Sequence, residues 1–411
     1  MKSPQKRNQL FFTLLLGLSL LIASVAYRQT ASPPDRRVFR VALFPYIPDA
    51  AGDSYAKLLS RIEKEFEAEN PSVDLVLKPM ADDGFYEVEK LTEWLSNDPS
   101  GGGYHLVEVD TLLLGDLVSS NLAAEWAAPP GLSDWHRAGA EGVNVGGKVY
   151  GVPHWLCGHF IFTRDKKIAK AKTVSQLLDA LRSADPSITN VTGVLTGSWN
   201  MPALYLDAWA DTYGPKNVGS AISPNLDGTV MKSFKSFSQQ CETGGKNPCL
   251  DGTFADNDLS AKQFADGKAD AFFGYSERLN FILRQGAGGP RVEVASAPLG
   301  EGKRPLLFVD AFVMRRGCDV SCQEAAAKFA AYMNRPQTHE WILMSHDAGA
   351  NAVPRYLLPA TRSAYKAPQV RRDRYFKTLG EEIKDGAAYP VSGIPGMRKK
   401  MRDEILKQLQ Q

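Results

Sequence analysis

Residues 149–163 of this chain have the sequence VYGVPHWLCGHFIFT, and this stretch decides how the whole chain is organised. β-Branched and aromatic side chains are frequent in it, which predicts extended backbone. Pro153 interrupts the run, because proline has no N–H to donate to a sheet. Alternating strand and helix patterns lie on both sides of the stretch. We therefore interpret it as the place where the chain crosses from a first lobe to a second.

The part before the crossover alternates between strand and helix patterns. Apolar runs at 38–44, 73–77 and 105–109 predict strands, and residues 54–66 carry apolar side chains on one helical face. A second helix is expected through Trp94. This alternation predicts βαβ units, in which helices cover both faces of a sheet.

The alternation starts again after the crossover. We expect helices at 173–181 and 203–213 and strands at 191–195, 269–274, 292–295 and 306–314. From Ser321 onwards the pattern is entirely helical.

Two lobes are the expected architecture, because 411 residues exceed what one compact core normally supports. The predicted fold class is α/β, with the two-lobed fold of the type 2 periplasmic binding proteins, a ligand cleft between the lobes and a helical C-terminal part. We assign residues 38–154 and 311–411 to lobe 1 and residues 155–310 to lobe 2.

The composition is that of a globular protein, with 44% hydrophobic and 23% charged residues. The formal net charge is only +2, which gives no strong field for a polyanion. We therefore expect no nucleic-acid partner.

The amino terminus has the order of a secretory leader. Lys2, Lys6 and Arg7 precede an apolar run from Leu10 to Ala26, and small residues end that run. We interpret residues 1–26 as a signal peptide or, alternatively, an uncleaved membrane anchor, and residues 27–37 as a linker. The protein is expected to be exported, to the periplasm or the extracellular space, with no stable membrane partner beyond that possible anchor.

The chain has five cysteines, an odd number for a protein in an oxidising compartment. Cys241 and Cys249 flank the loop ETGGKNP, and Cys318 and Cys322 flank Asp-Val-Ser, so two local disulfides are the economical pairing. Four cysteines still allow three pairings. Cys157 is left over, either as a reactive thiol or as a buried, inert one.

Six candidate site residues follow from the rule that ligands collect at the ends of strands. They are Tyr46, Asp110, Cys157, Tyr275, Glu277 and Asp310. A thiol needs a base or a cation nearby to become a nucleophile, and Glu277 can serve as the base if burial raises its pKa. The phenols can stack on a flat ring, and the aspartates can face its amino groups or positive charge. No metal or cofactor is expected.

Six segments resemble bacterial thiaminase I in the same order along the chain. They are LFPYIPD, HLVEVDTLLL, GKVYGVPHWLC, FFGYSE, LLFVDAFV and YLLPA. The resemblance implies a monomeric transferase whose cysteine attacks the pyrimidine of thiamin and displaces the thiazole, after which a second nucleophile takes the pyrimidine. It implies that Cys157 is the nucleophile and Glu277 the general base. It also implies that Tyr46, Asp110, Tyr275 and Asp310 line the substrate site.

Three features depart from the family pattern. Phe308 stands where the family carries a phenol, Gly158-His159 replaces a pair of small polar residues, and the loop between Cys241 and Cys249 looks like an addition. The nucleophile and the base are unaffected. These differences bear on the preferred substrate and on the second nucleophile.

Two other functional classes compete with this interpretation. His154 and His159 flank Cys157, which would suit a cysteine hydrolase or, less well, a metal site formed by these three residues. A solute-binding protein for thiamin, a pyrimidine or a sugar would have the same fold, with tryptophans as ring-stacking walls. The candidates for such walls are Trp155, Trp199 and Trp209, although a tryptophan within a helix, as Trp209 is, is more often a core residue. Cys157 together with Glu277 favours the enzyme.

Overall fold

The computed structural model describes residues 36–45, 47–80, 84–182, 188–254, 257–286, 291–303, 305–349 and 351–410. The predicted leader, most of the predicted linker and the candidate Tyr46 lie outside these residues. Within them, no helix is both long and apolar enough to span a bilayer.

The first lobe is built on a mixed sheet, which has seven strands among the described residues. In spatial order these are β12 (Leu358–Pro359), β6 (Val152–Cys157), β11 (Leu306–Met314), β3 (Leu106–Asp110), β1 (Arg37–Ala42) and β2 (Val73–Leu77), and β13 (Ala387–Ala388) pairs with β11. The strands β1, β2 and β3 are parallel, as the βαβ pattern predicts. β11 runs antiparallel to β3 and β6 and thereby joins the returning chain to this sheet.

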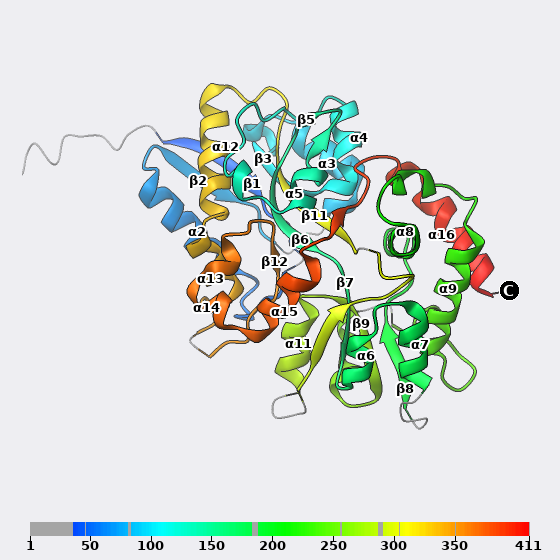
Figure 1. Ribbon diagram of the computed structural model, residues 1–411. Coiled ribbons are helices and arrows are strands. Elements are labelled where there is room, and N and C mark those ends of the chain that lie inside the picture. The colour runs from blue at the N-terminus through cyan, green and yellow to red at the C-terminus, as the bar shows by residue number, and fades with distance from the viewer. Residues whose placement is uncertain are drawn as a thin grey trace, which may run out of the picture.

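The second lobe contains a smaller sheet (Figure 1). Its strands, in order, are β10 (Glu293–Ser296), β7 (His159–Thr163), β9 (Ala269–Tyr275) and β8 (Thr189–Gly193). A separate hairpin pairs β4 (Asn144–Val145) with β5 (Lys148–Val149). The predicted two-lobed α/β fold is therefore confirmed.

The crossover lies at Gly158, between β6 in the first sheet and β7 in the second. This is a few residues beyond the predicted change between 154 and 155, since β6 continues to pair with β11 as far as Cys157. The return is earlier than predicted, because β11 is already in the first sheet at Phe308. We keep the division into two lobes as a proposal with these shifted limits.

Helices surround both sheets (Figure 1). They are α2 (Ala56–Glu69), α3 (Val88–Ser96), α4 (Leu114–Ser119), α5 (Arg137–Gly142), α6 (Lys166–Lys170), α7 (Val174–Arg182), α8 (Asn200–Tyr213), α9 (Gly228–Ser238), α10 (Asn257–Ala265), α11 (Arg278–Gln285), α12 (Val320–Met333), α13 (Pro336–Leu343), α14 (Pro368–Arg372), α15 (Arg374–Ile383) and α16 (Ile394–Gln410). The C-terminal helix α16 packs against α8 and α9 of the second lobe, and it also contacts the turn Thr111–Leu113 that follows β3 in the first lobe.

The period-two pattern of the crossing strand explains how two apolar cores meet the second sheet. Phe160 and Phe162 point into the larger core, which continues from the first lobe, whereas Ile161 points into the smaller core under α7, α8 and α9. Alternate side chains of a strand lie on opposite faces, so both faces of β7 are covered. All three side chains are buried.

The four paired cysteines form the two local bridges, Cys241–Cys249 and Cys318–Cys322. Their Cα–Cα separations are 6.0 Å and 5.4 Å, which are ordinary for a disulfide. Cys157 is the free cysteine of the described chain.

Candidate active site

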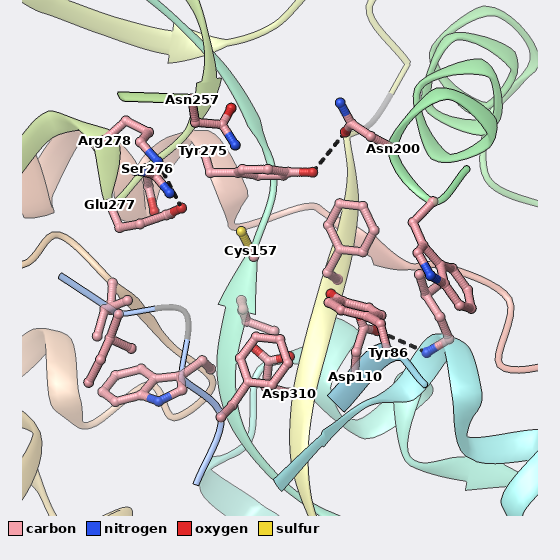
Figure 2. A pocket seen from close by; sticks show the side chains of 18 residues that line it. Tyr86, Asp110, Cys157, Asn200, Asn257, Tyr275, Ser276, Glu277, Arg278 and Asp310 are labelled. Carbon is pink, nitrogen blue, oxygen red and sulfur yellow. Dashed lines mark hydrogen bonds and ion pairs between the residues drawn. The ribbon is translucent and has the colours of Figure 1, made fainter. Parts of the chain in front are cut away.

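A cavity of about 230 Å³ lies between the two lobes, where strand ends of both sheets meet (Figure 2). Its polar lining consists of Tyr86, Asp110, Cys157, Asn200, Asn257, Tyr275, Ser276, Glu277, Arg278 and Asp310. Five of the six predicted site residues therefore share one cavity, and the sixth, Tyr46, is outside the described residues. Phe44 and Ile47 also line the cavity, on either side of that position in the chain.

Cys157 is the last residue of β6 and is half-buried at the cavity wall. The strand is irregular just before it: Asp310 of β11 pairs with Trp155, but the next residue, Ala311, pairs with Pro153. His154 is thus the extra residue of a β-bulge, a device that redirects side chains near active sites. Trp155 and Cys157, two residues apart, both face the cavity.

The thiol of Cys157 is surrounded by acids rather than by cations. Burial raises its pKa well above the usual value, and the negative charges of Glu277, Asp310 and Asp110 raise it further. The thiol therefore stays protonated at neutral pH in the free protein. Of the two activating devices expected from the sequence, a base or a cation, the site contains the base.

Glu277 comes from the second lobe, immediately before α11, and is only 8% exposed. Its carboxyl group and the Cys157 sulfur point toward the same space in Figure 2. Burial raises the pKa of Glu277, and this is partly offset by Arg278, whose Nε lies 3.8 Å from Oε1. A carboxylate with a raised pKa is a stronger base, which suits it to receive the proton of a thiol.

Asp110 and Asp310 lie opposite each other on the paired strands β3 and β11. Burial raises the pKa of Asp110 to about 6, although the carboxylate accepts hydrogen bonds from Leu112 N at 2.9 Å and Tyr86 Oη at 2.8 Å. Burial, followed by repulsion from Asp110, Glu108 and Glu277, raises the pKa of Asp310 well above its usual value. The two carboxyls together therefore retain a proton to higher pH than isolated carboxyls would.

Sequence reasoning did not identify two of the polar groups that hold the site together. Tyr86 donates to Asp110, and Asn200 accepts a hydrogen bond of 2.9 Å from the Tyr275 hydroxyl (Figure 2). Tyr86 lies well beyond the end of β2, and Asn200 begins α8, so neither directly follows a strand. The strand-end rule does not reach such positions.

The two histidines beside Cys157 are engaged elsewhere. His154 Nδ1 is 2.6 Å from Glu108 Oε1, and His159 Nδ1 is 2.6 Å from Asp207 Oδ2. Both rings are buried and neither lines the cavity. The geometry thus contradicts the cysteine–histidine hydrolase and the three-residue metal site. No group of three or more potential metal ligands occurs among the described residues.

The three tryptophans differ in position. Trp155 and Trp199 line the cavity, and the Trp199 ring lies 5.4 Å from that of Tyr86 and 4.0 Å from the guanidinium carbon of Arg398. Trp209 instead packs along its own helix against Tyr213, at 5.3 Å. The first two are available to stack on a ligand ring, whereas Trp209 is a packing residue.

Comparisons with known proteins agree with this geometry. Residues 50–376 match the family model described as bacterial extracellular solute-binding protein. The sequence is 25% identical to thiaminase-1 of Paenibacillus thiaminolyticus over 377 residues, which is 86% of this chain and 83% of that protein. The resemblance to thiaminase I inferred from the six segments is thereby confirmed.

Solved structures show the same fold. Clostridium botulinum thiaminase I in complex with thiamin aligns with a TM-score of 0.72 at 20% identity, over 91% of this chain and 100% of that one. The GacH receptor of Streptomyces glaucescens, solved unliganded and with acarbose, aligns with a TM-score of 0.63 at 16% identity, over 91% and 96% of the two chains. The fold is thus shared by enzymes and by sugar-binding receptors.

Proposed function

This chain belongs to the bacterial extracellular solute-binding protein family, and on that premise we propose that its cleft is catalytic and degrades thiamin. Cys157 would act as the nucleophile and Glu277 as the general base of a transferase that moves the pyrimidine to a second nucleophile. The family is one of exported proteins, which agrees with the predicted leader. Removal of that leader, residues 1–26, and a periplasmic rather than extracellular location remain part of the proposal.

The observation that carries the proposal is the meeting of a free thiol and a buried carboxyl in one cavity between the lobes. Burying Glu277 costs free energy, because its charged form loses hydration. A receptor that only binds sugars gains nothing from an unpaired thiol beside such a group. A reaction that begins with proton transfer from sulfur to carboxylate needs both groups.

The positive charge of thiamin would supply the cation that the Cys157 thiol lacks in the free site. Thiamin carries a positive thiazolium ring, and the acids that raise the pKa of Cys157 would be neutralised by that charge when it occupies the cavity. The thiol pKa then falls just when the substrate is present. Glu277 takes the sulfur proton as the carbon–sulfur bond to the pyrimidine forms.

Loss of the thiazole completes the first half of the reaction. The bond between the methylene bridge and the thiazolium nitrogen breaks, and its electron pair stays on nitrogen, so the leaving group is neutral. Sulfur addition puts electron density on the pyrimidine ring nitrogens, which needs hydrogen-bond donors in response. Asp310 lines the cavity and, because its raised pKa keeps it protonated to higher pH, it would provide one such donor.

The second half reverses the roles. An amine, thiol or similar acceptor attacks the pyrimidine group that is bound to Cys157. The carbon–sulfur bond breaks, and the sulfur takes the proton back from Glu277. The Glu277 carboxylate then takes the proton of the acceptor. The overall reaction converts cationic thiamin and a neutral acceptor into two neutral products and one proton. We propose a monomeric protein with no cofactor for this reaction.

A solute-binding function is the second candidate, and the likeness to the GacH receptor favours it. The size of the cavity argues against an oligosaccharide, since about 230 Å³ is below the range of about 300–1,000 Å³ that is usual for ligand pockets. The two small linked rings of thiamin need less space than a chain of sugar units. Trp155 and Trp199 would serve either ligand as stacking walls.

The test is to measure free thiazole during incubation with thiamin and an added amine, for the wild type and for Cys157→Ser. The proposal expects catalytic release by the wild type, none by the variant, and thiamin binding of similar affinity by both in calorimetry. Glu93→Gln, an exposed substitution on α3 away from the cavity lining, is the control variant and should release thiazole like the wild type. Tight binding of thiamin without thiazole release by the wild type would identify a receptor instead.

A further inference from the structure

A second cavity, of about 440 Å³, lies at the opposite end of the first sheet from the cleft. It is formed where β1 and β3 begin and where β11 ends, next to the Cys318–Cys322 disulfide. Its lining includes Arg37, Arg40, His105 and Arg315. Three guanidinium groups and an imidazole thus surround one solvent-accessible hollow.

Arg40 is half-buried and has no carboxylate partner among the described residues. Its Nε is buried and lacks a hydrogen-bond acceptor in this part of the chain. The guanidinium lies over the ring of Tyr104, 5.2 Å from its centroid. A partly buried guanidinium without a counter-charge is costly, so this side chain is prepared for an anion.

Arg315 makes no ion pair with a carboxylate of the described residues, although the charge of Asp98 acts on it. Its side chain donates only to backbone carbonyls of the described chain, to Leu95 O at 3.5 Å and Ser96 O at 3.4 Å. These long contacts orient the side chain without neutralising its charge.

The two acids at the rim of this cavity are occupied by other donors. Asp98 accepts hydrogen bonds from the N–H and the hydroxyl of Ser100, at 2.9 Å and 2.6 Å. Asp319 accepts from Cys322 N at 2.8 Å and from Arg37 at 2.9 Å. Arg37 and Asp319 therefore pair with each other, and the charge of Asp98 acts on Arg315. Three guanidinium groups and two carboxylates leave the lining with a net charge of +1, and among the described residues Arg40 is the guanidinium without a carboxylate beside it.

His105 adds a neutral donor. Its Nδ1 accepts a hydrogen bond of 3.0 Å from the backbone N–H of Arg40, which leaves the ring proton on Nε2. Burial, then the positive charges of Arg37 and Arg315, lower the pKa of His105 to about 4. The ring thus stays uncharged at neutral pH and can donate one hydrogen bond to an anion.

We propose that this second cavity binds a phosphate group, held by Arg40 and Arg315 with His105 as an additional donor. Guanidinium groups match the oxygen geometry of phosphate, and the partly enclosed setting strengthens each contact. The phosphate can belong to a free phosphate or phosphate ester, or to an anionic phospholipid head group. The binding function proposed for the cleft is not required for this site.

The probes are inorganic phosphate and pyrophosphate, added to the full chain at constant ionic strength with chloride as the reference anion. We expect a saturable rise in melting temperature, since a ligand that binds only the folded state stabilises it. Arg40→Gln and Arg315→Gln should each raise the Kd at least about tenfold, the effect of one lost charge-assisted contact. Arg316→Gln, exposed and outside the cavity lining, should leave the Kd within twofold.

Sedimentation with phosphatidylglycerol vesicles distinguishes the two sources of phosphate. Co-sedimentation that is lost in the Arg40→Gln/Arg315→Gln double variant, together with weak binding of the free anions, assigns the site to a lipid. Tight binding of the free anions without co-sedimentation assigns it to a soluble phosphate. The proposal is wrong if neither probe binds the wild type above the chloride reference, or if the double variant, folded by circular dichroism, binds like the wild type.

Discussion

Cys157 is a thiol that its surroundings keep protonated in the free protein. Burial and three neighbouring acids raise its pKa in the free protein, so it is not a standing thiolate of the kind found at cationic sites. A protonated thiol is slow to react with oxidants and other electrophiles, which suits a free cysteine in an oxidising compartment. The positive thiazolium ring of thiamin, the proposed substrate, would offset the negative charges of these acids and so lower the pKa of the thiol.

The first prediction concerns the base. Glu277→Gln keeps the shape of the side chain but cannot accept the thiol proton, so formation of the covalent intermediate should slow by about 10²–10⁴-fold. Thiamin binding should change far less, because the proton transfer belongs to the chemical step. Rapid-quench measurement of the first turnover checks this. An unchanged rate would remove Glu277 from the role of base.

The second prediction concerns the carboxyl pair. The pKa of Asp310 is raised in the folded state, so the wild type gains stability below the unfolded pKa of about 3.9 and loses it as the pH rises through the folded value. Asp310→Asn removes this titration. The variant should therefore be more stable than the wild type at pH 7, by about 1 kcal/mol or more, while losing activity.

Urea unfolding at a series of pH values measures this difference. The difference in the free energy of unfolding between Asp310→Asn and the wild type should shrink toward zero near pH 4, where the wild-type pair is protonated. Asp251→Asn is the control of opposite sign, since hydrogen bonds from Thr253 lower the pKa of that exposed carboxylate. A less stable Asp310→Asn at pH 7 would contradict the account of the pair.

The sequence allowed prediction of site residues that follow a strand or end it. Asp110, Cys157 and Tyr275 are the last residues of their strands, and Glu277 follows two residues after one. Asp310 is different: it lies in the middle of β11 and reaches the site because that strand runs antiparallel to β3 and β6. A local pattern does not reveal such pairing, so the strand-end rule selects Asp310, which lies inside the expected strand 306–314, for the wrong reason.

At the scale of elements, the link between β6 and β7 determines the geometry around the nucleophile. A side chain at Gly158 would place its Cβ 2.9 Å from Leu307 Cδ2, so the Leu307 side chain of β11 would have to shift to accommodate it. The change of sheet at this residue breaks the simple alternation of side chains. His159, the first residue of β7, pairs with Asp207 of α8.

The third prediction tests that pair as a structural link. Asp207 Oδ2 contacts His159 Nδ1 at 2.6 Å, and Oδ1 accepts a hydrogen bond of 3.0 Å from Leu306 N, so it ties α8 to β7 and β11. Asp207→Ala leaves buried polar groups without partners. It should lower the free energy of unfolding by about 3–5 kcal/mol.

The matched control is Asp179→Ala, which breaks an exposed ion pair with Arg182 on α7. Exposed pairs contribute little, so its effect should stay below about 1 kcal/mol. Denaturant midpoints of the two variants give the comparison. Equal effects would show that the His159–Asp207 pair does not link the elements as described.

The fourth prediction counts thiols. The pairs Cys241–Cys249 and Cys318–Cys322 are bridged, so the unfolded, unreduced protein should react with a thiol reagent at one cysteine, and after reduction at all five. Cys157→Ser should show none before reduction. Three or more reactive thiols in the unreduced wild type would contradict the pairing.

At the scale of the whole molecule, the candidate site requires both lobes. Cys157, Asp110 and Asp310 belong to the first sheet. Tyr275 is the last residue of β9 in the second sheet, and Glu277 lies two residues after it. The proposed nucleophile, Cys157, and the proposed base, Glu277, therefore meet only when the lobes are close, as in the structure (Figure 2). Closure around a substrate would also exclude water from the covalent intermediate.

The architecture was more predictable than the lobe limits. Strand and helix periods placed the main elements, for example β2 at Val73–Leu77, because each element has its own apolar face. The placement of α16 was not predictable, since its amphipathic pattern is equally compatible with packing on either lobe. Long-range pairing, such as β11 with β6, depends on contacts that no local pattern specifies.

Intact-mass analysis after incubation with thiamin, without an added acceptor, tests the central claim most directly. The account predicts a stoichiometric increase by the mass of the pyrimidine fragment, located on the peptide that contains Cys157, with an equal amount of thiazole released. The same increase should be absent in Cys157→Ser and much slower in Glu277→Gln. Saturable thiamin binding by the wild type with no mass increase and no thiazole release would contradict the claim that this cleft performs a reaction.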